Sequence, residues 1–596
     1  MGLGILEDSV MEHVPGTTRY FDDPLRPQIA HDGLAGLKCD NSGPEPIILV
    51  PQPSDDPNDP LNWPLWKRDL ITATLSITAI FATALGPILA ANTITLSLWF
   101  TRDFTKVALL TGYYLLGVGF AGTFFVPSSR IWGKRHAFVI GTCILIGSSA
   151  WGGAVNKNYT SMLWARIVQG VGTAPFEALV NAAIGDLYFV HQRGKRMAFT
   201  NLAVFGGSFF TPILVGKITH TIKWWWTFNL IAIFCAMCLP LIIFLCPETA
   251  YRRDDTLNLD LLATDENAAI RQGAQPIGKR DSSGNDEEKT NGAAEPAIAT
   301  APEGAASAAA AAAAATATDP SATAPADAER SAQAQNVPEK VSYVKSLALF
   351  NGRKTDENFF KLFLRPFPLF LQPAFLWASL TQGTLIGWTV FIGVVMAEFF
   401  LGYPLWWDEV KTGYAYTGAF VGAICGFLIA GLLADWSAKK LTRMNNGIYE
   451  PEFRLVLVIP QLVFGVMGLY GFGITIDGMM KAKFNWAVPL VFFGFEVCGM
   501  VIGAVASSLY IVDAYRDLSI EGFTCLLIFK NFFSYGLTYK AYDWLVANGT
   551  KARPVFNALG SVQLVVCLLA IPMYVFGKRN RSFFYRHDIL KMLGLR

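Results

Sequence analysis

Three ionisable side chains interrupt apolar stretches that are long enough to cross a lipid bilayer. Glu177 lies about halfway along residues 163–189, and Glu496 and Lys530 lie within two later apolar stretches. A charge in the middle of a membrane costs several kcal/mol unless it faces a polar cavity or a partner. Carboxylates at this depth can bind and release a proton, and they attract a cationic solute. All three residues are therefore candidates for substrate or proton binding.

The alternative interpretation of these charges is structural. Either carboxylate can pair with Lys530, or the two can share a proton, and both arrangements hold helices together. Lys530 can also bind an anionic group of a solute. Further binding candidates on the same kind of stretch are Gln382, Trp388 and Asn531. A Trp in a membrane helix also packs against lipid or neighbouring helices, so Trp388 keeps that second interpretation.

The composition indicates a protein that faces lipid. Hydrophobic residues make up 52% of the 596 residues and charged residues only 16%, whereas soluble domains contain about 25% charged residues. The net charge of +2 gives no indication of a nucleic-acid partner. No nucleotide-binding loop, H-E-x-x-H or G-x-S-x-G motif occurs, so neither an ATP-driven pump nor an enzyme is predicted. The nine cysteines lack ligand spacing in a loop, and we expect no metal and no cofactor.

Twelve segments have the length of about 20 apolar residues that a membrane-spanning helix needs. Six of them lie at 70–91, 107–127, 137–155, 161–185, 198–218 and 225–246. After an interruption, the other six lie at 368–395, 412–434, 455–475, 486–510, 521–546 and 554–577. The predicted fold class is an all-α membrane protein with twelve transmembrane helices in two six-helix bundles, at 70–246 and 366–577.

The remaining parts of the chain are polar. Residues 1–69 are Pro-rich and predict a disordered cytosolic tail, which ends in an interfacial anchor around Trp63 and Trp66. Residues 247–365 include the alanine run 308–315 and are typical of a low-complexity cytosolic linker. Residues 578–596 form a basic cytosolic tail.

Basic residues predict the orientation in the membrane. They cluster in the loops after the second, fourth and eighth segments and in the C-terminal tail, which places both chain ends in the cytosol. Two glycosylation sequons, at Asn158 and Asn548, fall in loops predicted to lie outside, and we expect a glycoprotein. The expected location is the plasma membrane, with the vacuolar membrane as the alternative.

Two segments at matching places in the two halves end in basic pairs. Each is predicted to be a tight basic turn that caps helix C-termini and acts as a gating loop at the inner face. The residues that define them are Arg130, Gly133, Lys134 and Arg135 in the first half, and Gly431, Asp435, Lys439 and Lys440 in the second.

These segments resemble the signature G-x-L-a-D-r-x-G-r-k of the major facilitator superfamily, and the resemblance covers about 60–250 and 340–580. The first copy has Arg130 where the signature has Asp. Arg166, Gln169 and Gly170 resemble the family's fourth-span motif R-x-x-q-G, whose arginine is linked to proton coupling in relatives. DPLNW before the first span, residues 186–194 and PET at 247–249 resemble the fungal twelve-span drug:proton antiporter branch.

The resemblance implies two pseudo-symmetric halves around a central cavity lined by spans 1, 4, 7 and 10. Glu177 and Glu496 are then expected to face this cavity. The antiporter motif of span 5 keeps Gly207, Pro212 and Gly216, but Thr211 and Val215 replace two of its glycines. Pro212 is predicted to kink this helix. Importers often lack this motif.

We therefore expect a secondary active transporter that exports a small drug-like compound or secondary metabolite by proton-coupled alternating access. Uptake of organic cations such as polyamines is the alternative. A transporter-like nutrient sensor is an alternative of another class. The expected partners are a small organic solute, protons and the lipid bilayer, and we expect a monomer.

Overall fold

The computed structural model describes residues 3–8, 10–11, 14, 16–19, 38–40, 47–49, 53–252, 339–445, 448–515 and 518–596. The helices on both sides of the gap at 253–338 belong to one compact unit. Most of the predicted linker lies outside the described residues.

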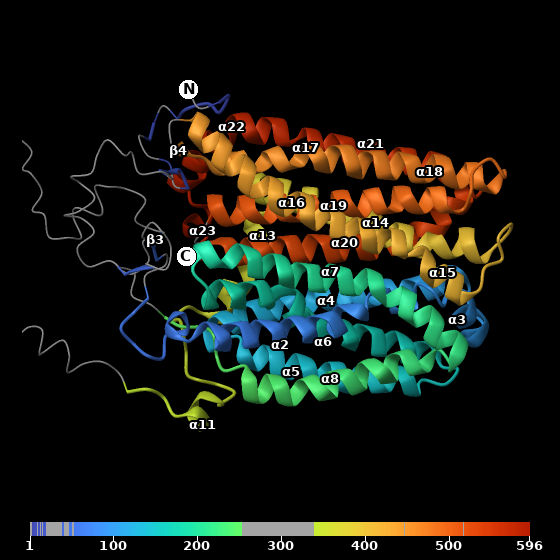
Figure 1. The fold of residues 1–596 in the computed structure, drawn as a ribbon, viewed down its shortest axis with the longest axis horizontal. Coiled ribbons are helices and arrows are strands. Elements are labelled where there is room, and N and C mark those ends of the chain that lie inside the picture. The colour runs from blue at the N-terminus through green and yellow to red at the C-terminus, as the bar shows by residue number, and fades with distance from the viewer. Residues whose placement is uncertain are drawn as a thin grey trace, which may run out of the picture. The chain divides into compact units, whose positions relative to one another are not determined.

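The first half contains six long helices that run side by side (Figure 1). They are α2 (Leu65–Ala84), α4 (Phe104–Trp132), α5 (Arg135–Ala154), α6 (Tyr159–Leu187), α7 (Val190–Thr221) and α8 (Trp225–Leu245). Short helices η1 (Pro60–Asn62), η2 (Pro87–Leu89) and α3 (Thr93–Phe100) flank α2 and precede α4.

The second half repeats this arrangement with more interruptions. Three of its six spans are single helices: α14 (Pro373–Leu401), α19 (Ala487–Ala514) and α20 (Ser519–Ala547). Two are pairs of helices: α15 (Glu409–Ala415) with α16 (Thr417–Met444), and α21 (Ala552–Leu568) with α22 (Ala570–Arg586). The remaining span consists of η5 (Pro451–Leu457), α17 (Val458–Gln461), η6 (Leu462–Val466) and α18 (Met467–Met480). Three short helices, α11 (Tyr343–Ser346), α12 (Phe359–Leu364) and α13 (Pro366–Leu369), precede them, and α23 (Ile589–Met592) follows.

All twelve predicted spans are therefore helical, and the all-α prediction is confirmed. Ten are long and apolar enough to cross a membrane on length and composition alone. The other two predicted spans, α2 and α20, are more polar. Helix α2 has Lys67, Arg68 and Asp69 near its start, and α20 contains Glu521 and Lys530. Both pack against other helices of the bundle, which bury Arg68 of α2 and Glu521 of α20 and leave little of Lys530 exposed.

The first span differs from its predicted limits. Helix α2 begins at Leu65 rather than residue 70 and ends at Ala84 rather than residue 91. Gly86 and Pro87 follow directly. Because Pro lacks a backbone N–H and Gly weakens a helix, the chain turns there into the short helix η2.

The two predicted gating turns also differ. Helix α4 continues to Trp132, and the turn is confined to Gly133 and Lys134, where Gly133 has a φ of 92°. The prediction of a turn at 431–440 is wrong, because α16 runs without a break to Met444. Most residues after Gly431 are good helix formers, and neither Pro nor Gly occurs before Met444, so nothing ends the helix earlier.

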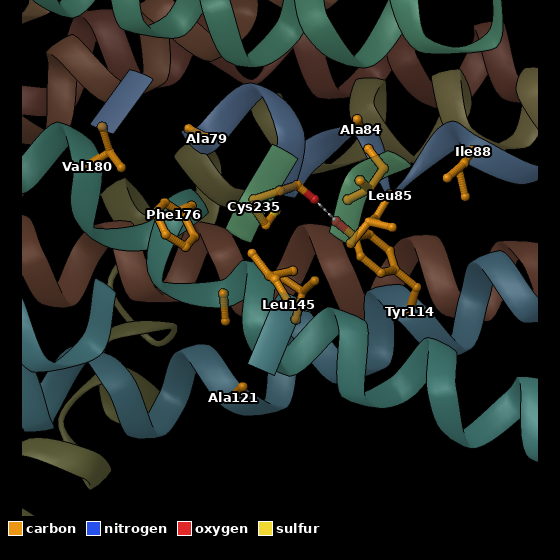
Figure 2. Packing of buried hydrophobic residues seen from close by; sticks show 14 of the residues in the cluster. Ala79, Ala84, Leu85, Ile88, Tyr114, Ala121, Leu145, Phe176, Val180 and Cys235 are labelled. Carbon is orange, nitrogen blue, oxygen red and sulfur yellow. Dashed lines mark hydrogen bonds between the residues drawn. The ribbon is translucent and has the colours of Figure 1, made fainter. Parts of the chain in front are cut away.

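The first half has an apolar core where α2, α4, α5, α6 and α8 meet. Figure 2 shows Ala79, Tyr114, Leu145, Phe176 and Cys235 from these five helices gathered in it. Cys235 and Cys238 both carry free thiols, so the C-x-x-C pattern serves packing here. The second half has its own clusters around α14, α16, α18 and α19.

The first described residues of the N-terminal tail, up to Arg19, lie against the second half. Ile5 is 3% exposed and packs with Ala438, Tyr449 and Phe453. Leu6 N–H donates to the Val575 carbonyl at 3.0 Å. Strand β1 (Thr18–Arg19) pairs antiparallel with β4 (Ile448–Tyr449), and β2 (Cys39–Asp40) pairs with β3 (Ile47–Ile48). The tail was predicted to lack a core of its own, and these residues instead use the core of the bundle.

Candidate functional site

A cavity of about 190 Å³ lies between the two halves. Helices α2, α4, α6 and α7 line it from the first half, and α14, α19 and α20 line it from the second. Most of the lining is apolar, as in sites for small organic ligands. The polar side chains in the lining are Thr83, Thr93, Thr111, Tyr114, Glu177, Ser208, Thr389, Tyr416 and Lys530.

Glu177 and Lys530 form an ion pair across the two halves of the bundle. Glu177 comes from α6 and Lys530 from α20, and both line the cavity. Their side chains are 20% and 12% exposed. The sequence left open which carboxylate Lys530 meets, and the fold brings it to Glu177. The pair leaves this part of the cavity without net charge while placing two strong hydrogen-bonding groups there.

Glu496 occupies a different environment. It lies on α19, is 0% exposed and does not line the cavity. The Thr389 hydroxyl of α14 lies 2.8 and 3.0 Å from its two carboxyl oxygens. Thr389 and Met500 do line the cavity, and Thr389 is the polar contact between that space and Glu496.

The three other predicted binding residues also lie outside the cavity lining. Trp388 is 4% exposed, and its indole N–H donates to the Gln563 side chain at 3.1 Å. The Gln382 oxygen accepts from the Ser507 hydroxyl at 3.3 Å. The Asn531 amide donates to the Leu527 carbonyl at 3.0 Å. Each side chain is thus engaged in helix packing in this conformation.

Arg166 binds the end of α2. It is 0% exposed and donates to the carbonyls of Leu85 at 2.8 Å and Gly86 at 3.4 Å. The Leu85 carbonyl lies just past Ala84, the last residue of α2, where carbonyls have no helical donor. Arg166 also donates to the Gln169 oxygen at 2.8 Å and lies 4.8 Å from the centre of the Tyr114 ring.

Gly170 serves close packing between α6 and α4. A Cβ atom at this position would lie 2.1 Å from the Tyr114 carbonyl oxygen. The same contact surface contains Gly117, whose Cβ would lie 2.2 Å from the Ile167 carbonyl oxygen. The motif at 166–170 therefore joins α6 to the end of α2 and to α4, next to Tyr114, which lines the cavity.

Pro212 lies within α7, where the two halves also meet closely. A Cβ on Gly413 of α15 would lie 2.5 Å from the Pro212 carbonyl oxygen, and a Cβ on Gly216 would lie 2.3 Å from the Glu409 carbonyl oxygen. Helices α7 and α15 thus lie in close contact although Thr211 and Val215 replace glycines of α7. Gly413 of α15 provides part of the space.

Arg130 joins the halves at the opposite end of the helices. It forms an ion pair with Glu521 at the start of α20 and approaches Glu357 to 3.8 Å. Arg365 also approaches Glu521, to 3.5 Å, and pairs with Glu357 at 2.5 Å. Glu521, Glu357 and Arg365 are members of this network that the sequence reasoning missed.

The neighbouring residues of the first turn bind helix ends within their own half. The Glu248 carboxylate accepts from the backbone N–H groups of Lys134 at 2.8 Å and Arg135 at 3.1 Å. Gly133 leaves room for this carboxylate, because a Cβ there would lie 2.1 Å from it. Lys134 pairs with Asp186 at 2.5 Å.

Arg135 completes this arrangement. Its guanidinium donates to the carbonyls of Ile243 and Cys246 at the end of α8. The expectation that basic residues of this turn cap helix C-termini is met in the first half. The PET segment contributes the carboxylate that caps the N-terminus of α5.

The second half uses other residues to link its helix ends. Asp435, Lys439 and Lys440 are exposed on α16. No atom lies within 4 Å of a Cβ built on Gly431. Arg454 instead pairs with Asp513 at 2.9 Å, linking the start of the ninth span to the end of α19.

The Arg454–Asp513 pair occupies the position in the second half that Lys134–Asp186 occupies in the first. Lys134–Asp186 links the start of the third span to the end of α6. The signal in the sequence was Arg454 at the start of the ninth apolar segment.

Both sequons lie at the end of the bundle away from Arg130. Asn158 caps α6 by accepting from the Ser161 N–H at 3.2 Å. Asn548 ends α20 and donates to the Trp544 carbonyl at 2.8 Å. Glycosylation of either stays a prediction.

Comparison with known proteins gives the family. The model described as "Major Facilitator Superfamily" matches residues 71–516. "Protein HOL1" of Saccharomyces cerevisiae is 24% identical over 96% of this chain and 95% of its own length. "MFS antiporter QDR3" of Candida albicans is 28% identical over 37% of this chain and 31% of its own length.

Among solved structures, a D-xylose-proton symporter is similar in fold. Its TM-score is 0.53 at 13% identity, and the match covers 86% of this chain and 99% of that chain. The twelve helices in two halves, the cavity between them and the family match lead to one conclusion. The chain belongs to the Major Facilitator Superfamily and is a multi-pass membrane transporter.

Proposed function

We propose that this transporter exports a small organic compound in exchange for protons by alternating access. The observation that carries the proposal is the cavity between the halves, with an ion pair between Glu177 of one half and Lys530 of the other in its lining. An antiporter among the relatives supports exchange, and a proton symporter among the structures of similar fold supports the use of protons.

Two sets of contacts hold the halves together, one on each side of the cavity. On the inner side Arg130 pairs with Glu521. On the outer side the Thr95 hydroxyl of α3 donates to Glu409 of α15, and Gly216 and Gly413 keep α7 and α15 in contact. Opening one set while the other stays closed exposes the cavity to one side of the membrane at a time.

The ion pair gives the solute a point of action in the cavity. A cationic group that reaches Glu177 competes with Lys530 for the carboxylate, and an anionic group competes with Glu177 for the ammonium. Either event removes an attraction between α6 and α20, which belong to different halves. Loading the cavity therefore changes the free energy that separates the two open states.

Export is tested by identifying the cargo. Cells with and without the protein are compared by mass spectrometry of extracts and medium. An exporter predicts compounds that accumulate inside cells that lack the protein and fall in their medium. The Arg130→Ala/Glu521→Ala variant, made in the same cells, should mimic the loss. An unchanged intracellular and extracellular profile would contradict export.

Uptake of organic cations such as polyamines is the second candidate. Glu177 is the one carboxylate in the described cavity lining, and the apolar walls suit methylene chains. Radiolabelled spermidine separates the two directions: uptake that falls when the protein is deleted favours import. We also propose a plasma-membrane location with the Arg130 side of the bundle in the cytosol, as the basic clusters indicate.

A further inference from the structure

Glu496 is a buried carboxyl group without a cationic partner. It is 0% exposed, and among the described residues no Lys, Arg or His forms an ion pair with it. Its hydrogen-bond partner is the Thr389 hydroxyl. An ionised carboxylate in such a place costs several kcal/mol, because neither water nor a cation compensates the lost hydration.

The charged groups on the elements packed against α19 are occupied elsewhere or lie near helix ends. Lys530 on α20 pairs with Glu177, and Arg454 on η5 pairs with Asp513. The other charged groups on these elements are Glu452 on η5, which pairs with Arg581; Asp477 on α18, which accepts from Ala552 and Arg553 N–H; Glu521 on α20, which pairs with Arg130; and Glu398, Asp435, Lys439, Lys440, Arg443, Lys540 and Asp543. The neutral titratable groups on them are Cys425, Cys525, Tyr470, Tyr535, Tyr539 and Tyr542.

The hydrogen bonds around Thr389 are complete only for a protonated carboxyl. The Thr389 oxygen also lies 2.9 Å from the Leu385 carbonyl oxygen. A hydroxyl has one proton and cannot donate to both Leu385 and Glu496. If Glu496 holds a proton, it donates to the Thr389 oxygen, and Thr389 donates to Leu385. If Glu496 is ionised, the Thr389 hydroxyl has to donate to it, and the Leu385 carbonyl keeps only the backbone N–H of α14 as its donor.

Thr389 also connects this carboxyl group to the cavity. It lines the cavity from α14, whereas Glu496 lies behind it on α19. A proton from cavity water can bind the Thr389 oxygen while the hydroxyl passes its own proton to a carboxyl oxygen of Glu496. The threonine is regenerated, and the carboxylate becomes a neutral acid.

We propose that Glu496 carries the coupled proton and that Thr389 is the positioning residue through which it exchanges with the cavity. Glu177 and Lys530 then interact with the solute. This inference rests on the proposed proton coupling and divides its two tasks, proton binding and solute binding, between two sites.

Infrared spectroscopy of the purified protein tests the assignment with protons as the only probe. At neutral pH we expect a band from a protonated carboxyl group that disappears in Glu496→Gln, an isosteric variant. The same band should persist in Glu177→Gln/Lys530→Met, which removes the other pair. Thr389→Val should shift the band because it removes the hydrogen-bond partner, and Thr389→Ser should restore it.

Transfer to deuterated buffer tests the path. The carboxyl band should exchange rapidly in the wild-type protein and several-fold more slowly in Thr389→Val. A neutral-pH spectrum that Glu496→Gln leaves unchanged would overturn the assignment. So would a band that exchanges as slowly as buried backbone amides, because such a proton does not reach the cavity. No solute is present, so failure here leaves the export proposal standing, and failure of export leaves this band in place.

Discussion

Breaking the Glu177–Lys530 pair from one side should destabilise the folded protein more than removing both charges. Loss of one partner of a fully buried pair costs about 3–5 kcal/mol, because the other charge stays buried alone. Exposed pairs are worth about 0–1 kcal/mol. With side chains 20% and 12% exposed at a cavity, we expect about 2 kcal/mol for Glu177→Gln and about 2 kcal/mol for Lys530→Met.

The double variant Glu177→Gln/Lys530→Met should lose about 1 kcal/mol or less, because no unpaired charge remains. The double-mutant cycle then gives a coupling energy of about 3 kcal/mol. Equilibrium unfolding in mixed detergent micelles, followed by tryptophan fluorescence, measures each variant under identical conditions.

A matched control is available on the same helix. Lys540 and Asp543 of α20 form an exposed pair, with side chains 66% and 58% exposed. The same cycle at Lys540→Met and Asp543→Asn should give less than about 0.5 kcal/mol. Additive effects of the two single variants at Glu177 and Lys530 would refute the reasoning, because independent residues do not form a pair across the cavity.

Three further predictions concern the packing and the inner face. Gly170→Ala should destabilise the protein by about 1–3 kcal/mol because its Cβ meets the backbone of α4. Gly185→Ala on the same helix adds a Cβ that meets no other side chain or helix within 4 Å, and it should leave the unfolding midpoint unchanged or raise it. Arg130→Ala should speed deuterium uptake in the first turn of α20, since Glu521 loses its partner from the first half; unchanged uptake would mean that the pair does not hold this end. Glu248→Ala should cost about 1–2 kcal/mol of unfolding free energy through loss of the α5 cap, and Glu248→Gln should cost less; equal losses would argue against the capping role.

The pattern of apolar segments was sufficient to predict the helices and their order. A stretch of about 20 apolar residues has few alternatives to a helix in lipid, because every backbone group must find a partner within the chain. The ends of the helices were harder to predict than their existence. Trp132 and Met444 end helices that continue past the apolar segments, because polar residues extend a helix equally well once it leaves the membrane.

The candidate site was predicted in part. The three membrane charges stood out by type, and their cost in lipid made them candidates for binding a solute or a proton. Their pairing was not predictable, because Glu177 and Lys530 are far apart in sequence and belong to different bundles. Thr389 escaped notice, since a threonine on an apolar helix carries no signal of its own. The link between helix ends that was predicted for Lys439 and Lys440 is made by Arg454. The basic pair was the more conspicuous pattern in the sequence.

Features that depend on local composition could be predicted without a structure: the membrane class, the twelve helices, the two halves and the carboxylates inside the membrane. The tertiary structure decided which side of each helix faces the cavity. That choice placed Glu177 in the lining opposite Lys530 and Glu496 behind Thr389. Helix–helix packing sets these faces through close contacts such as Gly170 against Tyr114. Such contacts form between residues distant in sequence, so local pattern alone does not contain them.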